Sequence, residues 1–400
     1  MISRAYKFRL YPNKEQQEQI EKTFVACRFV WNRCLEMRQA EYDVNKKTMS
    51  TTKMCNLITM LKHSGVSPWL ADAPVSALQQ SVRDLDQAYS NFFRRLRESK
   101  ENPDDKKPLG FPKYKKAGSH QSYRTPAGGR LDKSTGRYVG QAVAVIDSRH
   151  VKLPKLGTVK CRITQMPEGH ILSATVRRVP SGKYFCSITC KDVPDPEMPE
   201  GSLDVMGVRF GVRDVITCSD GVKVKNQRTY ANVERKLRRE KRKLSRRVGA
   251  RKNERKSANF LKQKRKVARI EERAANQRRD NIHKATTRIV RDSRAVAASS
   301  NKVSEMMRGS RAAKQIADAG MGEAMRQLAY KSEWHQRTFI KVDSSTAFAK
   351  TCSRCGAKGE PKLGSSWTCP SCGTRHDYAL NAAKNIASIG SMEMMRQKLQ

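Results

Sequence analysis

Two pairs of cysteines near the C-terminal end constrain the fold of this chain more than any other pattern. Cys352 and Cys355 form the first pair, Cys369 and Cys372 form the second, and 13 residues separate the pairs. Glycine follows the second cysteine of each pair and permits a tight turn. Four thiolates at this spacing are typical of a tetrahedral structural Zn²⁺ site, which leaves no open position for water. We therefore predict a zinc ribbon with one zinc ion. His376 lies outside the pairs and is interpreted as a residue that leads into the next helix.

The remaining cysteines indicate a reducing compartment. The chain has 11 cysteines, an odd number, and seven of them are scattered without a pairing pattern. Such a set favours reduced, mostly buried thiols over disulfides. No apolar run approaches the roughly 20 residues of a membrane-spanning helix, and no secretory signal opens the sequence. We therefore expect a cytoplasmic protein without a membrane partner.

The charge of the chain predicts a polyanionic partner. It has 81 Lys and Arg against 38 Asp and Glu, a formal net charge of +43. The densest stretch, residues 231–280, holds 21 Lys or Arg against six acids, with sparse apolar residues that predict two long helices around Gly249. So one-sided a charge predicts contacts to phosphates rather than a merely solvated face. The candidate contacts there are Arg239, Arg242, Lys243, Arg246, Arg247, Arg251, Lys252, Arg255 and Lys256.

The N-terminal half changes its periodicity several times. A strand over residues 4–11 precedes amphipathic helices over 13–34, 53–62 and 74–97, which we expect to form a small bundle. Residues 99–140 are rich in Lys, Gly, Pro and Ser and predict a basic loop or a segment ordered by nucleic acid. Short alternating runs over 141–191 predict a small antiparallel barrel. A linker rich in Pro follows at 192–202.

Several motifs resemble one known family. They are AYKFRLYP and ACRFVWN near the N-terminus, GVRDVITCSDG, AANQRRDNIHKATT (274–287), IADAGMGEAMRQLAYK (316–331) and the tail TCSRCG…WTCPSCGTRHDYALNAAKNIA (351–387). Together they resemble the TnpB family of transposon-encoded, RNA-guided DNA nucleases, which are related to type V CRISPR effectors. The resemblance extends over nearly all 400 residues.

The resemblance implies an α+β multidomain fold. A wedge β-barrel would comprise residues 1–12 and 98–195, with a helical recognition domain at 13–97 inserted into it. After a linker at 196–202, an RNase H-like RuvC core would comprise 203–348 and 376–400, with a basic helical insertion at 230–290. The zinc finger would comprise 349–375.

The resemblance also locates a nuclease site whose acids are missing. Such nucleases hold two divalent ions roughly 4 Å apart with carboxylates from separate elements. The family supplies these acids from a G-x-D-x-G strand, a V-x-x-E-D-L strand and the second Asp of H-D-R-D-x-N-A-A. The corresponding positions here hold Arg209, Ser299 (or Ser300 if the register shifts by one) and Ala379. The resemblance therefore implies no catalytic Mg²⁺.

Neighbouring acids could replace the missing ones. Six lie near these positions in the sequence. They are Asp204, Asp214, Asp220, Glu305, Asp343 and Asp377. Asp204 precedes Arg209 by five residues on a strand and therefore faces the opposite side of the sheet. Asp377 matches a family residue distinct from the metal ligand.

The resemblance implies nucleic-acid partners and further contacts. The partners are a guide RNA derived from the transposon end and a double-stranded DNA target with a short flanking motif, bound by a monomer in the bacterial cytoplasm near the nucleoid. We expect contacts from the N-terminal half as well, with Gln79 and Thr125 near the flanking motif. These contacts are Lys7, Arg9, Arg28, Gln79, Tyr123, Arg124 and Thr125.

We expect an RNA-guided DNA-binding protein without nuclease activity that represses transcription where its guide directs it, similar to the nuclease-dead TnpB-like repressors. Two alternatives remain at this level. One is an RNA-guided DNA endonuclease with rearranged metal ligands, and the other is a degenerate transposon protein that binds RNA only.

Overall fold

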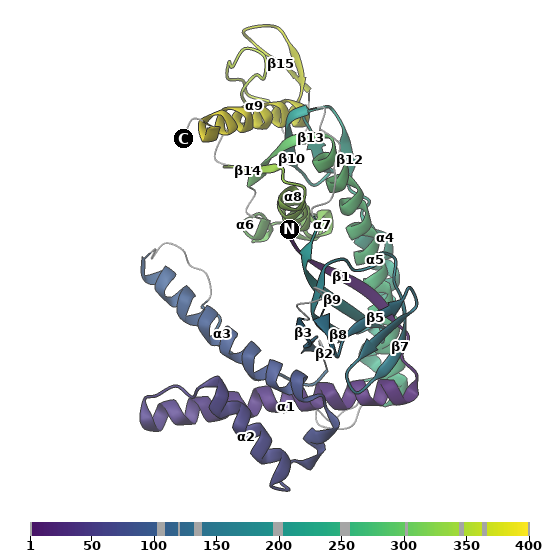
Figure 1. The fold of residues 1–400 in the computed structure, drawn as a ribbon. Helices are drawn as coiled ribbons and strands as arrows, with labels where there is room; N and C mark the ends of the chain where they lie inside the picture. The colour runs from purple at the N-terminus through teal and green to yellow at the C-terminus, as the bar shows by residue number, and fades with distance from the viewer. Residues whose placement is uncertain are drawn as a thin grey trace. The chain divides into compact units, whose positions relative to one another are not determined.

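The chain forms two compact units, Met1–Pro194 and Asp195–Gln400, called here the N-terminal and C-terminal units (Figure 1). The computed structural model describes residues 2–101, 109–118, 121–131, 138–194, 203–248, 257–300, 303–343, 348–361 and 366–398. No helix among these residues is both long enough and apolar enough to cross a membrane.

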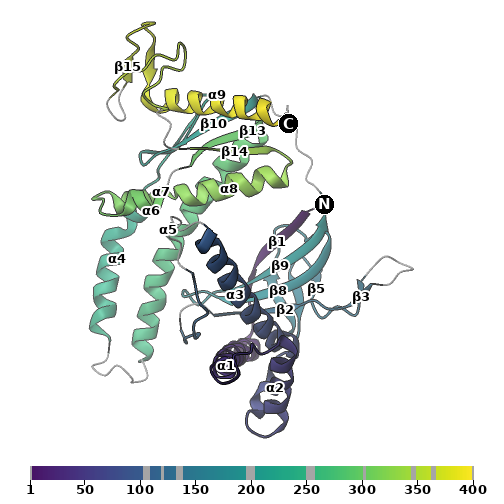
Figure 2. The same ribbon diagram turned by 90° about the vertical axis from the view of Figure 1, so that its left-hand side faces the viewer.

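A curved seven-stranded sheet organises the N-terminal unit (Figure 2). Its order is β2-β8-β9-β1-β7-β6-β5, with antiparallel neighbours throughout. The strands are β1 (Ile2–Leu10), β2 (Gln121–Pro126), β5 (Ala144–Asp147), β6 (His150–Leu153), β7 (Gly157–Arg162), β8 (His170–Arg178) and β9 (Tyr184–Val193). The Ala142 amide donates to the Ala127 carbonyl at 2.7 Å, so the chain just before β5 meets the chain just after β2. Because β2 and β5 are the two edge strands, this hydrogen bond partly closes the sheet into the predicted barrel.

Strand β2 lies within residues 99–140, for which the sequence predicted a basic loop or a segment ordered by nucleic acid. It pairs with β8 over Gln121–Pro126, and the short strands β3 (Arg130–Leu131) and β4 (Tyr138–Val139) pair with each other. The sequence QSYRTP is polar at most positions, and only its non-local pairing with β8 makes it a strand.

The predicted helices are confirmed between β1 and β2. They are α1 (Lys14–Asn45), α2 (Thr51–His63), the 3-10 helix η1 (Pro68–Asp72) and α3 (Val75–Glu101). Helix α1 begins with a capping box, because the Asn13 side chain accepts from the Gln16 amide at 2.7 Å and the Gln16 side chain accepts from the Asn13 amide at 3.1 Å. Leu35, Leu78 and Leu85 are fully buried among these helices.

A five-stranded sheet of order β12-β11-β10-β13-β14 forms the core of the C-terminal unit. Strands β10 (Leu203–Phe210), β13 (Ser293–Ser300) and β14 (Thr338–Asp343) are parallel, whereas β11 (Asp214–Cys218) and β12 (Lys223–Lys225) continue antiparallel from β10. This arrangement is the α/β core that the sequence predicts.

Helices cover both faces of this sheet (Figure 2). Helix α9 (Tyr378–Lys398) packs Ile386 against Ala297 and Ile340 on one face. Helices α5 (Ala258–Arg291) and α8 (Met321–Trp334) pack on the other face, which is lined by Met206 and Val208. The remaining elements are α4 (Thr229–Arg246), α6 (Val303–Met307), α7 (Ala313–Ala319) and the two-stranded sheet of β15 (Ser366–Thr368) and β16 (Arg375–Asp377).

Two glycines permit the close approach of α9 to the sheet. A Cβ atom added to Gly207 on β10 would lie 2.0 Å from the Ala383 carbonyl oxygen, and one added to Gly390 on α9 would lie 2.4 Å from the Ala297 Cβ. Both distances are far inside van der Waals contact. The position of α9 therefore depends on these two residues having no side chain.

We predict that Gly207→Ala destabilises the C-terminal unit, because α9 must move away from β10 to admit the methyl group. The expected loss is about 1–3 kcal/mol, typical of overpacking. Gly322→Ala on α8 is the matched control, since a Cβ there meets nothing within 4 Å. Thermal unfolding of both variants checks the prediction, and equal melting temperatures would contradict it.

Candidate functional site

The carboxyl ends of β10 and β13 and the start of α9 meet on one face of the sheet. Strand alternation puts Arg209 on the same face as Gly207, and Ser299 on the same face as Ala297, which is the face that α9 covers. Ala379 lies in the first turn of α9. The three positions identified from the sequence are therefore brought to one end of one face. Ser300 points to the opposite face, which favours Ser299 as the equivalent position.

The chemistry at this point is cationic and polar. The half-buried Arg209 guanidinium lies over the Tyr378 ring, 5.2 Å from its centroid. Ser299 is buried, and its hydroxyl has no hydrogen-bond partner among the described residues. The N-terminus of α9 adds the positive end of the helix dipole.

Four of the six neighbouring acids have other partners or face elsewhere. Asp377 accepts from the Ala379 and Leu380 amides, so it caps α9, and it pairs with Lys223 at 2.8 Å. Asp220 pairs with Arg288 at 2.8 Å. Asp204 lies within 3.5 Å of Arg294, on the face opposite to Arg209. Asp343 lies opposite Ser300 in the register, so it also faces away from α9.

Four cysteine thiols converge in the C-terminal unit. The sulfur atoms of Cys352, Cys355, Cys369 and Cys372 all lie within 4.8 Å of one another, and among the described residues they form the one group of three or more His, Cys, Asp or Glu able to hold a metal. Cys352–Cys372 and Cys355–Cys369 Sγ distances are 3.7 and 3.6 Å. Four thiols at these distances suit a structural Zn²⁺.

Each cysteine pair sits on a matching turn. The Gly356 amide donates to the Cys352 carbonyl at 2.9 Å, and the Gly373 amide donates to the Cys369 carbonyl at 3.0 Å. Both glycines have positive φ, 77° and 67°, which a side chain would disfavour. A hydrogen bond from the Thr374 hydroxyl lowers the pKa of the Cys372 thiol to about 6, which favours the thiolate form.

His376 touches the cluster from outside it. It lies on β16, immediately before Asp377 and α9, and its Nε2 is 3.0 Å from the Cys352 sulfur. Its ring packs 5.0 Å from the Trp367 ring. This position fits a hydrogen bond that orients the thiolate, in the manner of supporting groups around metal ligands.

We predict about one zinc per chain in purified protein. Cys369→Ser removes a buried ligand and should abolish stoichiometric zinc and lower the melting temperature of the C-terminal unit. Cys218→Ser is the matched control, because Cys218 is buried in the same unit outside the cluster. Metal analysis and thermal unfolding provide the two measurements. Full zinc content in Cys369→Ser would contradict the four-thiol site.

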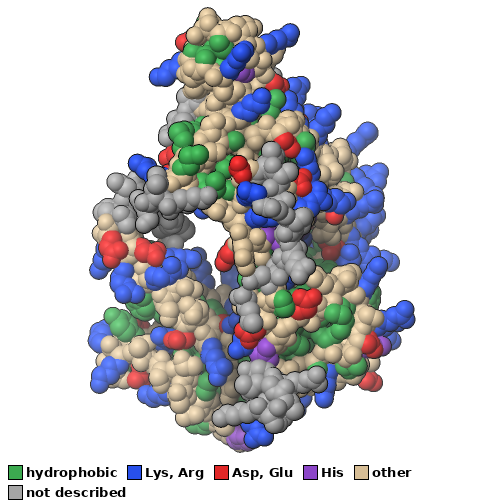
Figure 3. Space-filling view, turned by 45° about the horizontal axis from the view of Figure 1, so that its top comes forward, with side chains coloured by type: hydrophobic (Ala, Val, Ile, Leu, Met, Phe, Trp, Pro, Cys, Tyr) green, Lys and Arg blue, Asp and Glu red, His purple; other side chains and the backbone are tan. Residues whose placement is uncertain are grey.

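The basic hairpin consists of α4 and α5. The predicted pair of helices is confirmed, while Gly249, Arg251, Lys252, Arg255 and Lys256 lie outside the described residues. One exposed face of α4 lines a groove of about 830 Å³ with seven cations. These are Arg235, Lys236, Arg238, Arg239, Arg242, Lys243 and Arg246. Figure 3 shows how widely Lys and Arg side chains spread over one face of the molecule.

Glu240 holds the hairpin together from its inner side. Its carboxylate, 1% exposed, accepts from Gln263 Nε2 at 2.8 Å and lies 3.2 Å from Lys266. The hydrogen bond from Gln263 is the main reason that the pKa of Glu240 falls to about 2. Arg247 donates to the Asn259 carbonyl and to Gln263. The Arg247 guanidinium therefore helps to close the hairpin, and its contact with phosphate stays a prediction.

We predict that Glu240→Gln weakens the hairpin above pH 4.5 and has less effect as the pH falls. The pKa of Glu240 is lower in the folded state, so its stabilising contribution is present above the unfolded value of 4.5 and is lost as the pH falls toward 2. Urea unfolding at pH 7 and at pH 3 measures the difference. Asp280→Asn is the control, because the Asp280–Lys284 pair is exposed. If Glu240→Gln lowered the free energy of unfolding equally at both pH values, the stabilising role of the Glu240 charge would be contradicted.

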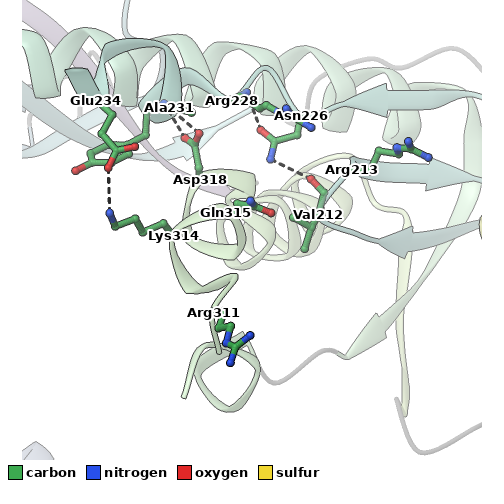
Figure 4. A pocket seen from close by; sticks show the side chains of 11 residues that line it. Val212, Arg213, Asn226, Arg228, Ala231, Glu234, Arg311, Lys314, Gln315 and Asp318 are labelled. Atoms are coloured by element: carbon green, nitrogen blue, oxygen red, sulfur yellow. Dashed lines mark hydrogen bonds and ion pairs between the residues drawn. The ribbon is translucent and has the colours of Figure 1, made fainter. Parts of the chain in front are cut away.

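A second acid anchors the start of α4 (Figure 4). Buried Asp318 on α7 accepts from the Tyr230 amide and the Thr229 hydroxyl at 3.0 and 3.1 Å, and pairs with Arg278 at 3.0 Å. It therefore caps α4 from another helix, since the Arg228 side chain provides no cap. A pocket of about 470 Å³ lies beside this joint. Arg213 and Arg311 both line this pocket and lie on different sides of it in Figure 4.

The predicted contacts in the N-terminal unit fall into two groups. Gln79 and Lys7 are exposed, and Lys7 and Arg9 lie over the Phe185 ring. Strand alternation in β2 buries Tyr123 against Phe24 and buries Thr125, whose hydroxyl is 2.8 Å from that of Ser76. Burial raises the pKa of the Tyr123 phenol.

These positions correct the expectation that Tyr123, Arg124 and Thr125 all face nucleic acid. Of these three residues only Arg124 is exposed, and its guanidinium pairs with Asp84. Arg28 and Arg124 line a common pocket of about 400 Å³, and Arg28 lies 3.5 Å from Gln121.

Comparisons with known proteins agree with these features. A helix-turn-helix domain family of IS605 OrfB proteins matches residues 1–47, a family described as "Probable transposase" matches 187–309, and the Cas12f1-like TNB domain matches 322–386. The chain is 31% identical over 404 residues to the "Putative RNA-guided DNA endonuclease InsQ" of Escherichia coli (strain K12), covering 96% of this chain and 92% of that protein. The chain belongs to the TnpB family of RNA-guided DNA endonucleases.

Other similarities support this TnpB assignment. A protein of Streptomyces pristinaespiralis with the same description is 28% identical, covering 97% of this chain and 90% of its own. The structure of the mini-RNA-guided endonuclease CRISPR-Cas_phi3 has the same fold, with a TM-score of 0.51 and 9% identity, covering 97% of this chain and 92% of that one. The fold is therefore a mixed α+β fold with a RuvC-like core and a four-Cys cluster.

Sequence reasoning missed Asp318 and Glu240 as the acids that position the basic hairpin. Glu240 is a single acid in a basic stretch and Asp318 is a single acid in a short helix. Neither belongs to a sequence motif that would predict its role. Spacing offered a partial signal for Glu240, which lies three residues after Leu237 on the apolar side of α4.

Proposed function

We propose that this TnpB-family chain binds DNA under RNA guidance without cutting it. The observation that carries the proposal is the composition of the RuvC-like site, where Arg209, Ser299 and Ala379 lie at the ends of β10, β13 and the start of α9. Two-metal cleavage needs several carboxylates within reach of both ions. Four of the acids near these positions, Asp377, Asp220, Asp204 and Asp343, cap a helix, pair with cations or face the other side of the sheet.

The basic hairpin supports the binding half of the proposal. Seven cations on one face of α4 can neutralise several phosphates of a guide RNA, and such contacts dominate the affinity of nucleic-acid complexes. In guided recognition the sequence is read by base pairing, and protein contacts to the backbones tip a nearly balanced strand exchange. Guided binding therefore requires a stable basic surface. Glu240 and Asp318 support such a surface by holding α4 in place.

Binding without cleavage leads to repression as the biological output. An uncut target keeps the complex on the DNA, and a bound R-loop placed over a promoter excludes RNA polymerase. The proposed partners are a guide RNA from the transposon end and a double-stranded target with a short flanking motif. The proposed cofactor is one structural zinc, without catalytic Mg²⁺.

A guided endonuclease with rearranged ligands is the second candidate. The observation in its favour is the description of the 31% identical relative as an endonuclease. It would require Asp377 to leave the α9 cap and Lys223, or Asp343 to reach across the sheet. A degenerate protein that binds only RNA is the third candidate, and it predicts no DNA complex.

We predict that the protein, purified with its RNA, shifts a matched DNA target and leaves it whole in Mg²⁺ or Mn²⁺. In cells, a reporter promoter that carries the guide match should lose expression while the plasmid copy number stays unchanged. The control is a promoter mismatched beside the flanking motif, where base pairing begins. A second sample carries Arg209→Asp, Ser299→Glu and Ala379→Asp together, for which we expect weak cleavage at most.

Each competing function gives a distinct result. Guide-dependent cuts by the unchanged protein, or plasmid loss in cells, would establish the endonuclease. An RNA complex that never shifts matched DNA would establish the RNA-only protein. Repression that is the same for matched and mismatched promoters would also reject guided binding.

A further inference from the structure

An aromatic groove in the N-terminal unit has no role in the functions described above. It encloses about 560 Å³ along α1, between η1 and the segment 113–115. Aromatic and aliphatic side chains form its walls, and two arginines lie at its rim. The groove is lined by Val25, Phe29, Trp69, Tyr114, Arg28 and Arg33, among others.

The groove exposes an unusual amount of apolar surface. Trp69 is 39% exposed, Val25 43% and Tyr114 51%. A single exposed apolar residue needs no explanation, but two aromatic side chains and one valine exposed around one concave site form a patch of the kind that marks binding sites. Folding gains nothing from leaving this surface in water.

Neighbouring contacts fix the rings in place. Phe29 and Trp69 pack edge to face with centroids 5.2 Å apart, and the fully buried Leu70 anchors η1 beside them. The Asn32 amide exchanges two hydrogen bonds with the Lys115 backbone, at 3.0 and 2.8 Å. The Tyr114 hydroxyl donates to Gln39 at 3.2 Å. The groove is therefore formed before any ligand arrives, so binding requires little ordering of side chains.

The positive charges at the groove favour a ligand that carries an anionic group. Arg28 and Arg33 lie at the groove, and only Arg33 has an acidic partner in it, Glu36 at 2.8 Å. Lys113 and Lys115 flank Tyr114 in the sequence, on a chain of net charge +43. An apolar ligand alone would leave these cations uncompensated. A nucleotide offers both a flat apolar base and an anionic phosphate.

We propose that this groove binds one unpaired base of a nucleic-acid strand, which stacks on Trp69 beside Tyr114 while Arg28 contacts the adjacent phosphate. The base must be unpaired, because a base within a duplex has its faces covered by its neighbours. The inference rests on the proposed function in that it assumes a bound nucleic acid. It adds a stacking site separate from the basic hairpin.

The test compares single strands that carry bases with strands that lack them. The full chain is titrated with adenine-rich RNA, adenine-rich DNA and an abasic strand of equal length. Trp69→Ala should weaken binding of the base-carrying strand about 5- to 150-fold, the range for loss of one base–aromatic stack. Binding of the abasic strand should not change, and the salt dependence should keep its slope because the phosphate contacts remain. The strand, RNA or DNA, whose affinity falls more in Trp69→Ala is the one that supplies the stacked base.

Two further variants separate stacking from folding. Trp69→Phe keeps a ring against Phe29 and should bind more tightly than Trp69→Ala. Tyr42→Ala removes an aromatic residue of α1 that is 56% exposed and does not line the groove, and it should bind like the unchanged protein. Tryptophan fluorescence gives a local signal, since base-carrying strands should quench the unchanged protein more than Trp69→Phe.

The experiment distinguishes failure of the stacking site from failure of the proposed function. If the unchanged protein binds no strand, the nucleic-acid function itself fails. If it binds but Trp69→Ala has no effect, the stacking site is rejected. An equal loss on abasic and base-carrying strands would likewise reject it, because it would show that Trp69 only supports the fold.

Discussion

The close contact between α9 and the parallel strands is the constraint on which the C-terminal unit depends. Gly207 and Gly390 remove the side chains that would separate the helix from the sheet. As a result the first turn of α9 lies at the carboxyl end of β10, with Tyr378 under the Arg209 guanidinium. The same helix continues from the zinc ribbon through β16, and Asn381 donates to the Thr351 carbonyl at 2.7 Å, just before the first cysteine. Helix packing therefore couples the metal ribbon to the RuvC-like site.

Two acids perform a comparable task for the basic hairpin. Eight cations against two acids in α4 would repel one another, and a helix of that composition would not pack by itself. Glu240 is placed inward against α5, and Asp318 neutralises the start of α4 from α7. Most of the other cations face outward along α4, although Arg238 pairs with Glu234 and Lys241 pairs with Glu271. Under the proposed function, stability and nucleic-acid affinity come from opposite sides of the same helix.

Local patterns predicted the elements with strong signals and missed those made by distant contacts. The cysteine spacing, the alternation in β1 and β9 and the apolar stripes of α1 and α3 each depend on residues close in sequence. Strand β2 depends on β8, some 50 residues later, so its polar sequence was interpreted as a loop. The same error placed Tyr123 and Thr125 on the surface. The aromatic groove brings Phe29, Trp69 and Tyr114 together from three separate segments, and no spacing rule could anticipate it.

Under the proposed function, the residues at the three identified positions change what the RuvC-like site can attract. Three carboxylates would give this site a formal charge of −3 and would require divalent ions before a phosphate could approach. Arg209, Ser299 and Ala379 give +1, beside the positive end of α9. A divalent ion about 5 Å from the guanidinium would be repelled by about 7 kcal/mol at an effective dielectric of 20, with no carboxylate among the three to offset it. A phosphate at the same place would be attracted without any metal. Under the proposed function, the site that would have cut a strand becomes another cationic contact that retains it.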